Sequence, residues 1–464
     1  MKTTTMTLLF AALVPAAASA YKTAGDGTTY TLEKLAQTTG TEIEKYVDED
    51  DGEVIYSIYA SDTIAAGDRF VMDDGVTLLF DDNVALVIEG EADFRLQQGS
   101  VFDSAFDDAD YVSPVGIVIA GSQSSTAFAN CQFYRVGLKS ASAKGISVSD
   151  CAFYYHNAAT GPAALYFVTA GALNTVTNSQ FEYCRRAAIG SPANASVAMR
   201  ISDCTFTANS QDNKNVPQIN VTAADSVVID HCTLTGDPQL NMVGGIGVSN
   251  FAGFTDTRTV IRRCHVSDHR YGLTTFGPTN VWIEDNVLTD NCHEQNPMNG
   301  GSGISLYDPY QQTVARITGN HIEGSLWGIT VIGCKDVNAG RTDVEVDDPN
   351  YNPGGNTFVR NGFDGQLYDL YNNSSNTVYA QGNTWNVSEQ TEELIETVIF
   401  HQHDDPKLGQ VIFMTAPTAI AATPADMPDT QSAPIYSLQG QRLVAAPRSG
   451  IYLRNGRKVA ATKH

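Results

Sequence analysis

A short phrase that recurs ten times along the chain limits its fold more than any other feature. Each copy has an apolar residue, two polar residues, then Cys, Asn or Ser at a key position, any residue, and an aromatic or aliphatic residue. The key positions are Cys131, Cys151, Ser179, Cys204, Cys232, Cys264, Asn286, Asn320, Asn356 and Asn383. They advance 252 residues in nine steps, an average of 28 with steps of 20 to 36. Such variable spacing excludes a coiled coil, which needs a fixed heptad.

Between the copies lies a second strand signal, a glycine followed by alternating apolar residues, at 245–248, 272–275, 303–306 and 328–331. Alternation with period two places one face inward and the other outward. A unit of about 28 residues cannot bury its inner face alone, but stacked units share one core with like strands paired in parallel. The repeat therefore predicts an all-β chain folded as a single-stranded parallel β-helix of about ten or more rungs.

Two copies, Ser-Asp-Cys-Thr-Phe at 202–206 and Glu-Asp-Asn-Val-Leu at 284–288, resemble the pectin-lyase-like β-helix repeats of secreted bacterial proteins. The resemblance covers about residues 60–415 and implies a right-handed coil. It is specific for the fold and not for the chemistry, because that superfamily spans lyases, glycoside hydrolases, epimerases and non-enzymatic surface proteins.

Charge and the N-terminus restrict the partners and the compartment. The 52 acidic and 28 basic residues give a net charge of −24, which repels nucleic acid and anionic membranes. Residues 1–20 have a basic start at Lys2, an apolar run and a small-residue exit, the pattern of a signal peptide. No later stretch is apolar enough for a membrane span. A secreted or cell-surface protein is expected, acting as a monomer.

Composition divides the rest of the chain into further segments. After the signal peptide we expect an N-terminal cap at 21–62 with a short helix at 31–38, the β-helix at 63–388 and a C-terminal capping helix and strand at 389–415. The capping helix is expected within 389–400, where Leu394, Ile395, Val398 and Ile399 form an apolar stripe at helical spacing. The stretch 416–434 is rich in Ala, Pro and Thr and is predicted to be a linker. Residues 435–464 hold six Lys or Arg and no Asp or Glu, and are expected to form a small β module.

Two segments near the end, 435–442 (IYSLQGQR) and 450–459 (GIYLRNGRKV), resemble the C-terminal sorting tail of type IX secretion. The resemblance implies recognition by that secretion machinery. The alternative is a small β-hairpin module unrelated to secretion.

Five of the eight cysteines occupy the key position of the phrase. A secreted chain with an even number of cysteines usually suggests disulfides. The regular placement indicates instead a stack of small buried thiols, and the Asn residues at the later key positions are interpreted as a structural ladder. No CxxC pair is present.

The outward positions of the phrase strand carry a mixed patch. Its members are the acid, base and aromatic candidates Asp230, Arg262, Glu284, Trp282, His265 and His321. We interpret Asp230, Arg262 and Glu284 as catalytic candidates, and Trp282, His265, His321 and the loop residue His293 as substrate-binding candidates, because sugar sites combine aromatic and charged groups. Asp230, Arg262, Glu284 and Trp282 are expected to be exposed. The alternative is a cross-strand ion-pair ladder from Asp230 through Arg262 to Glu284, which contributes little energy.

Three insertions interrupt the rungs, at 250–258, 290–301 and 335–355, and insertions in repeat proteins often gather on a binding face. The last contains an acidic run, Asp343, Glu345, Asp347 and Asp348, whose carboxylates could hold Ca²⁺; no cofactor is otherwise required. The Arg-x-x-Pro segment of pectate lyases and the Asn-Thr-Asp and Gly-His-Gly segments of polygalacturonases are missing.

Two functions remain open at this point. The first is a secreted or surface-exposed protein that binds a complex polysaccharide, either without cleaving it or with cleavage as a lyase or a glycoside hydrolase. The second is a surface β-helix without catalysis, an adhesin or a scaffold. The first rests on fold analogy alone.

Overall fold

A computed structural model describes residues 21–105, 115–157, 162–414, 435–437, 441–445, 451–454 and 457–460. The chain forms two compact units, residues 1–415 and 416–464. The predicted signal peptide and the predicted linker lie outside the described residues. In the described part of the chain, no helix is long and apolar enough to cross a membrane.

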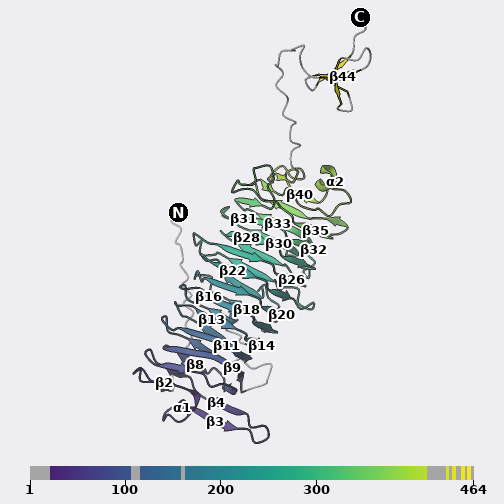
Figure 1. Ribbon diagram of the computed structural model, residues 1–464. Helices are drawn as coiled ribbons and strands as arrows, with labels where there is room; N and C mark the ends of the chain where they lie inside the picture. Colours follow the sequence, from purple (N-terminus) through teal and green to yellow (C-terminus); the bar gives the residue numbers. More distant parts are fainter. Residues whose placement is uncertain are drawn as a thin grey trace, which may run out of the picture. The chain divides into compact units, whose positions relative to one another are not determined.

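The larger unit is a coil of β-strands in which each strand pairs in parallel with its counterpart one rung later (Figure 1). The fold is a right-handed parallel β-helix. Each rung contributes to three faces, which we call sheets A, B and C. The predicted fold class is thereby confirmed.

Sheet A has fourteen strands, joined in one order along the coil. They are β1 (Tyr21–Lys22), β5 (Asp62–Ile64), β8 (Ala85–Ile88), β10 (Gly116–Ile119), β12 (Leu138–Ser140), β15 (Ala163–Phe167), β18 (Ala187–Gly190), β21 (Ile219–Thr222), β24 (Ile246–Ser249), β27 (Leu273–Phe276), β30 (Ser302–Tyr307), β33 (Trp327–Ile332), β38 (Leu370–Asn373) and β40 (Ile399–Phe400).

Sheet B precedes the key position in each rung. Its strands are β2 (Thr29–Tyr30), β6 (Arg69–Val71), β9 (Glu91–Ser104), β11 (Thr126–Tyr134), β13 (Ile146–Ser149), β16 (Asn174–Thr177), β19 (Met199–Ser202), β22 (Val227–Asp230), β25 (Thr259–Arg262), β28 (Asn280–Glu284), β31 (Val314–Thr318), β34 (Asp336–Asn338), β39 (Val378–Tyr379) and β41 (Val411–Ile412).

Sheet C follows the key position, and β9 and β11 run through the bend into it. Its other strands are β3 (Ile43–Val47), β4 (Val54–Ile58), β7 (Val76–Phe80), β14 (Ala152–Tyr154), β17 (Gln180–Glu182), β20 (Thr205–Thr207), β23 (Thr233–Thr235), β26 (His265–Ser267), β29 (Val287–Thr289), β32 (His321–Glu323) and β35 (Thr357–Val359). β3 and β4 pair antiparallel, as do β36 (Gly362–Phe363) and β37 (Gln366–Leu367).

The bend between sheets B and C explains why the phrase is polar just before its key position. There the backbone has a positive φ in rung after rung, a conformation that glycine, asparagine and aspartate tolerate best. The residues are Gly99, Asn130, Asp150, Asn178, Asp203, His231, Arg263, Asp285, Gly319, Gly355 and Gly382. The left-handed residue turns the chain, so the residue that follows it points into the coil.

The key residues form one continuous internal ladder. In its later half the backbone N–H of Asn286 donates to Oδ1 of Asn320 at 3.0 Å, and that of Asn320 donates to Oδ1 of Asn356 at 3.0 Å. The ladder continues to Asn383. In sheet C, phenylalanine rings stack beside the earlier ladder; Phe133 and Phe153 have centroids 4.5 Å apart, which matches the strand spacing of about 4.8 Å.

All eight cysteines are free thiols, and they include the five at key positions that the regular placement predicts to be unbridged. Seven are buried and Cys292 is half-buried. Burial raises the pKa of Cys184 and of Cys334 to about 12, so these thiols stay protonated and unreactive.

Thiol titration is therefore expected to give about one accessible thiol, Cys292, in the native protein, because the other seven cysteines are buried. All eight should react in denaturant. Cys232→Ala should lower the free energy of unfolding by about 1–2 kcal/mol, since it deletes a packed thiol. Fewer than eight reactive thiols in denaturant would contradict the unbridged ladder.

Parallel pairing extends past both ends of the predicted β-helix range, 63–388. At the start, β1 pairs with β5 and β2 with β6. At the end, β38 pairs with β40 and β39 with β41. The outermost strands, β1, β2, β40 and β41, have two residues each, too short for period-two alternation to reveal them.

Both expected cap helices are present and short. α1 (Leu32–Ala36) lies within the predicted 31–38 and buries Leu32 and Leu35, and α2 (Glu392–Glu396) buries Ile395. The predicted apolar stripe through Ile399 is wrong as a helix, because Ile399 lies on β40 and pairs with β38. Its burial comes from the sheet and not from a helical face.

Asp62 on β5 is fully buried, and burial raises the pKa of its carboxyl to about 6. In the unfolded chain an Asp carboxyl titrates near pH 3.9. The folded state thus holds the proton more tightly, so this contribution to stability is present below about pH 4 and is lost as the pH rises through 6.

The amide side chain in the Asp62→Asn variant does not ionise, so the variant lacks this pH dependence. As the pH rises from 4 to 7, we expect the free energy of unfolding of wild type to fall by about 2 kcal/mol relative to that of the variant. Urea unfolding of both proteins at the two pH values measures this difference. A stability difference that does not change with pH would contradict the buried, proton-binding carboxyl.

The second unit contains a four-stranded antiparallel sheet in the order β43-β42-β44-β45, which confirms the small β module. Its strands are β42 (Ile435–Tyr436), β43 (Arg442–Leu443), β44 (Ile451–Arg454) and β45 (Arg457–Ala460). Tyr452 is buried against this sheet.

Candidate functional site

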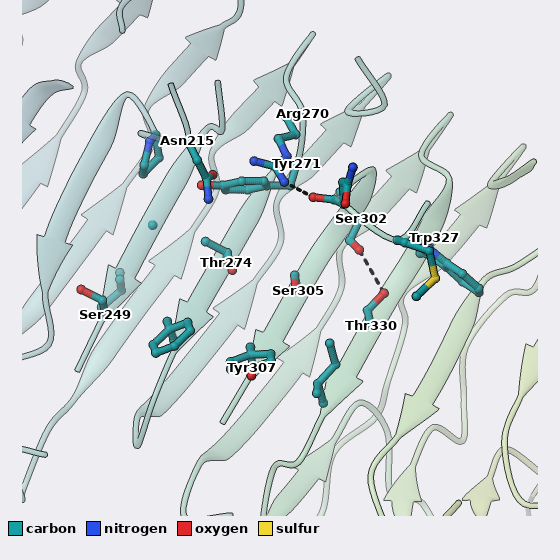
Figure 2. A pocket seen from close by; sticks show the side chains of 18 of the residues that line it. Asn215, Ser249, Arg270, Tyr271, Thr274, Ser302, Ser305, Tyr307, Trp327 and Thr330 are labelled. Atoms are coloured by element: carbon teal, nitrogen blue, oxygen red, sulfur yellow. Dashed lines mark hydrogen bonds between the residues drawn. The ribbon is translucent and has the colours of Figure 1, made fainter. Parts of the chain in front are cut away.

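A groove of about 470 Å³ lies on the outer face of sheet A. Its floor is a row of side chains in register on neighbouring strands, Thr274 on β27, Ser305 on β30 and Thr330 on β33. Gly247 and Asn220 extend the row on one side and Tyr371 on the other. Across these six strands the floor measures about 24 Å, and Figure 2 shows its small hydroxyl side chains.

Aromatic rings form one long wall of the groove. Phe276 and Tyr307 occupy the other outward row of sheet A, with ring centroids 4.9 Å apart. Phe251, from the insertion at 250–258, packs against Phe276 with tilted rings whose centroids are 4.6 Å apart, and it is 60% exposed. The three rings line this side of the groove as an apolar strip.

Trp327 forms the wall at the other side of the floor (Figure 2). Its ring stacks on Tyr371 with centroids 5.0 Å apart, and its Nε1–H donates to the carbonyl oxygen of Pro297 at 3.0 Å. This bond ties the insertion at 290–301 to β33. Met298 of the same insertion is 86% exposed at the rim.

Tyr271 and Arg270 complete the groove beside that insertion. The Tyr271 ring packs over Gly244, where a Cβ atom would come within 2.1 Å of the ring, so only glycine fits there. Burial raises the pKa of Tyr271 to about 12, and burial also raises the pKa of Tyr371. Both phenols stay protonated near neutral pH and can donate hydrogen bonds.

The lining of the groove holds few ionisable groups. Glycoside hydrolysis normally needs two carboxyl groups, and elimination needs a base near neutral pH. The described lining residues include no Asp, Glu, His or Lys, and Arg270 is the one charged group among them. The groove thus offers hydroxyls, phenols, amides and aromatic rings.

The sequence-predicted patch lies on a different surface, the outer faces of sheets B and C, and its predicted rows are in register. Successive strands of sheet B align Asp230, Arg262 and Glu284 in one row and place Trp282 in the next. Sheet C aligns the positions of His265 and His321. The structure therefore brings these residues together on one side of the coil, while their role stays a prediction.

Asp230 was expected to be exposed, and this is wrong: it is 6% exposed. Arg262 and Arg263 cover it, with Nη2 atoms 2.9 Å and 2.6 Å from its Oδ2. Burial raises the pKa of Asp230, but hydrogen bonds from the two arginines outweigh burial and lower it below the usual range. Because both arginines pair with it, this carboxylate is less available to contact a ligand.

The alternative prediction, an ion-pair ladder from Asp230 through Arg262 to Glu284, agrees with the structure for its first pair only. Arg262 pairs with Asp230, but no ion pair joins Arg262 to Glu284 in the described part of the chain. Trp282 lies half-buried under the guanidinium of Arg258, 5.2 Å from the ring centroid. A cation already covers that ring, which leaves less of it for a ligand.

The three histidine candidates have separate surroundings. His265 is exposed on β26. His321 lies 2.8 Å from Glu323, which also pairs with Arg360. His293 is half-buried, and its Nε2 is 3.9 Å from a carboxylate oxygen of Asp268.

The predicted calcium ligands do not converge. Among the described residues no three His, Cys, Asp or Glu side chains form a group that could hold a metal ion. Asp343 faces Arg341 at 3.6 Å, and Glu345 and Asp347 point into solvent. Oδ1 of Asp348, the last carboxyl group of the run, accepts from the backbone N–H of Asn350 at 2.7 Å.

Sequence reasoning missed the groove, although two signals pointed to it. The strand signals at 272–275, 303–306 and 328–331 include its floor, and the insertions at 250–258 and 290–301 supply parts of its walls. The repeated phrase identifies the strands of sheet B by their polar key position. The strands of sheet A have no such recurring polar position, so the repeat does not single out their outward residues.

Neither a protein-family model nor a curated protein sequence matches this chain. Among solved structures, it is similar to a periplasmic alginate epimerase AlgG, with 11% identity, 83% of each chain covered and a TM-score of 0.43. It is also similar to a mannuronic acid specific polysaccharide family 6 lyase from human gut microbiota, with 14% identity, 88% of this chain and 92% of that chain covered, and a TM-score of 0.32. Similarities of this size carry no information on the reaction of this chain.

Proposed function

We propose that this protein binds an extended segment of a polysaccharide in the sheet A groove and that the groove does not cleave it. The observation that carries the proposal is an open channel across six strands, with hydroxyls along its floor and aromatic rings along its walls. Sugars present both apolar C–H faces and hydroxyl groups, and sites that combine aromatic surface with a few polar groups match both.

The open shape favours a polymer over a small apolar ligand. Small-molecule sites bury most of their ligand, whereas this groove runs along the surface between Asn220 and Tyr371. The net charge of −24 also disfavours nucleic acid, the other common extended polymer. A non-catalytic binding protein or adhesin thus has more support here than a hydrolase or a lyase.

Incubation of the mature protein with a panel of neutral and acidic polysaccharides tests the proposal. Retention in affinity electrophoresis, with neither new reducing ends nor unsaturated products, is the expected result. Product formation would contradict the non-catalytic groove, and failure to retain any polysaccharide of a broad panel would contradict the binding function.

We further propose that the chain is exported and reaches the cell exterior. The support is the pattern of a signal peptide at 1–20 and the resemblance of 435–464 to a type IX sorting tail. Expression with and without residues 435–464 in a host that has this secretion system separates the alternatives. Equal export of the two forms would contradict a sorting role.

A further inference from the structure

Arg270 contributes a positive charge to the groove wall without a negative partner. The side chain is 8% exposed, and no Asp or Glu pairs with it in the described part of the chain. Its Nη2 donates to the carbonyl oxygen of Asn299. Its Nε and Nη1 atoms are buried and have no hydrogen-bond partner among the described residues.

The backbone holds this guanidinium in place. The N–H of Arg270 donates to Val243 at 2.7 Å, and its carbonyl oxygen accepts from the N–H of Gly301 at 2.7 Å. A Cβ atom at Gly300 would come within 2.9 Å of Nε, so glycine lets the loop close over the side chain. The charge is thus fixed beside the groove before any ligand arrives.

A buried charge without a partner is unfavourable, because water no longer solvates it and no carboxylate compensates it. The cost is recovered when an anion approaches, and a charge held in a poorly solvated wall acts on that anion more strongly than a charge in water. The two unused N–H groups lie below the wall surface. The guanidinium of Arg270 therefore attracts an anion in the groove through its charge. Hydrogen bonds from its Nε and Nη1 to that anion require the 297–300 loop to shift.

From this unpaired guanidinium beside the groove, we infer that the polysaccharide segment bound there carries an anionic group, a carboxylate or a sulfate ester, which lies next to Arg270. The inference rests on the proposed function of the groove. It runs against the net charge of the chain, −24. At about 0.15 M salt the Debye length is about 8 Å, so distant surface carboxylates are screened while a charge in the groove wall is not.

Two pairs of polymers test the inference at that salt concentration: polygalacturonate with its carboxyl-reduced form, and dextran sulfate with dextran. Wild type is expected to retain at least one anionic polymer about tenfold more strongly than its neutral partner. The pair that shows the difference distinguishes carboxylate from sulfate. Equal retention within both pairs, or no retention of any of the four, would overturn the anionic preference.

Arg270→Gln removes the charge and is expected to abolish the difference within the responding pair. Arg200→Gln is the matched control, because Arg200 is exposed on sheet B, away from the groove; it should keep the difference. A preference that survives Arg270→Gln in a folded variant overturns the assignment. If wild type binds polysaccharides of the broad panel but prefers none that is anionic, this inference fails and the proposed function stands.

Discussion

Replacing Asn320 by alanine is expected to lower the free energy of unfolding by about 4 kcal/mol. Asn320 is 1% exposed in the internal ladder. Its Oδ1 accepts from the backbone N–H and the Nδ2 of Asn286 at 3.0 and 2.9 Å. Its Nδ2 donates to Ile283 O at 3.0 Å and to Asn356 Oδ1 at 2.9 Å. Alanine leaves buried donors and acceptors of two neighbouring rungs without partners, and each such group costs about 1–3 kcal/mol.

Two further variants calibrate the effect by urea unfolding. Asn320→Ser should cost about 2 kcal/mol, because a hydroxyl can accept from the rung before it, as Ser179 accepts from the N–H of Cys151 at 3.1 Å. Asn280→Ala, on an exposed outward position of β28, should change stability by less than about 0.5 kcal/mol. Equal costs at Asn320 and Asn280 would contradict a ladder that holds the rungs together.

The fold could be predicted from sequence because the same short phrase encodes three physical requirements at once. The residue before the key position must tolerate positive φ, the key residue must fit an interior ladder, and the residue two positions later must fill the core. Asp203, Cys204 and Phe206 meet the three in one rung. With the key positions known, the outward rows of sheet B follow by counting, which is why Trp282 falls next to Val260 in register as expected.

The groove could not be predicted the same way. Its walls depend on contacts between residues far apart in sequence, such as the bond from Trp327 to Pro297, thirty residues earlier. The burial of Asp230 also escaped prediction, because it depends on where Arg263 points from its left-handed backbone position. Strands can be recognised by the periodic alternation of their residues, but no such periodicity reveals the conformation of a loop or the direction of a side chain at a bend.

Trp327→Ala is expected to weaken binding of the best polysaccharide about a hundredfold, since a large aromatic side chain in the wall of a binding site contributes about 2–3 kcal/mol. The substitution also frees the 290–301 insertion, which the indole N–H holds through Pro297. Trp327→Phe keeps a ring against Tyr371 but lacks the N–H, so a loss of about tenfold is expected. Affinity electrophoresis gives the dissociation constants, with circular dichroism to confirm that each variant folds.

Trp282→Ala is the matched control and decides between the two faces of the coil. Trp282 is the tryptophan of the sequence-predicted patch, half-buried on β28 beneath Arg258, and it does not line the groove. If the sheet A groove binds the polysaccharide, Trp282→Ala leaves the dissociation constant within about twofold of wild type, because it removes no contact with the ligand. The reverse pattern, with binding lost in Trp282→Ala and kept in a folded Trp327→Ala, would place the site on the outer faces of sheets B and C, with Arg262 and Glu284 on sheet B and His265 on sheet C.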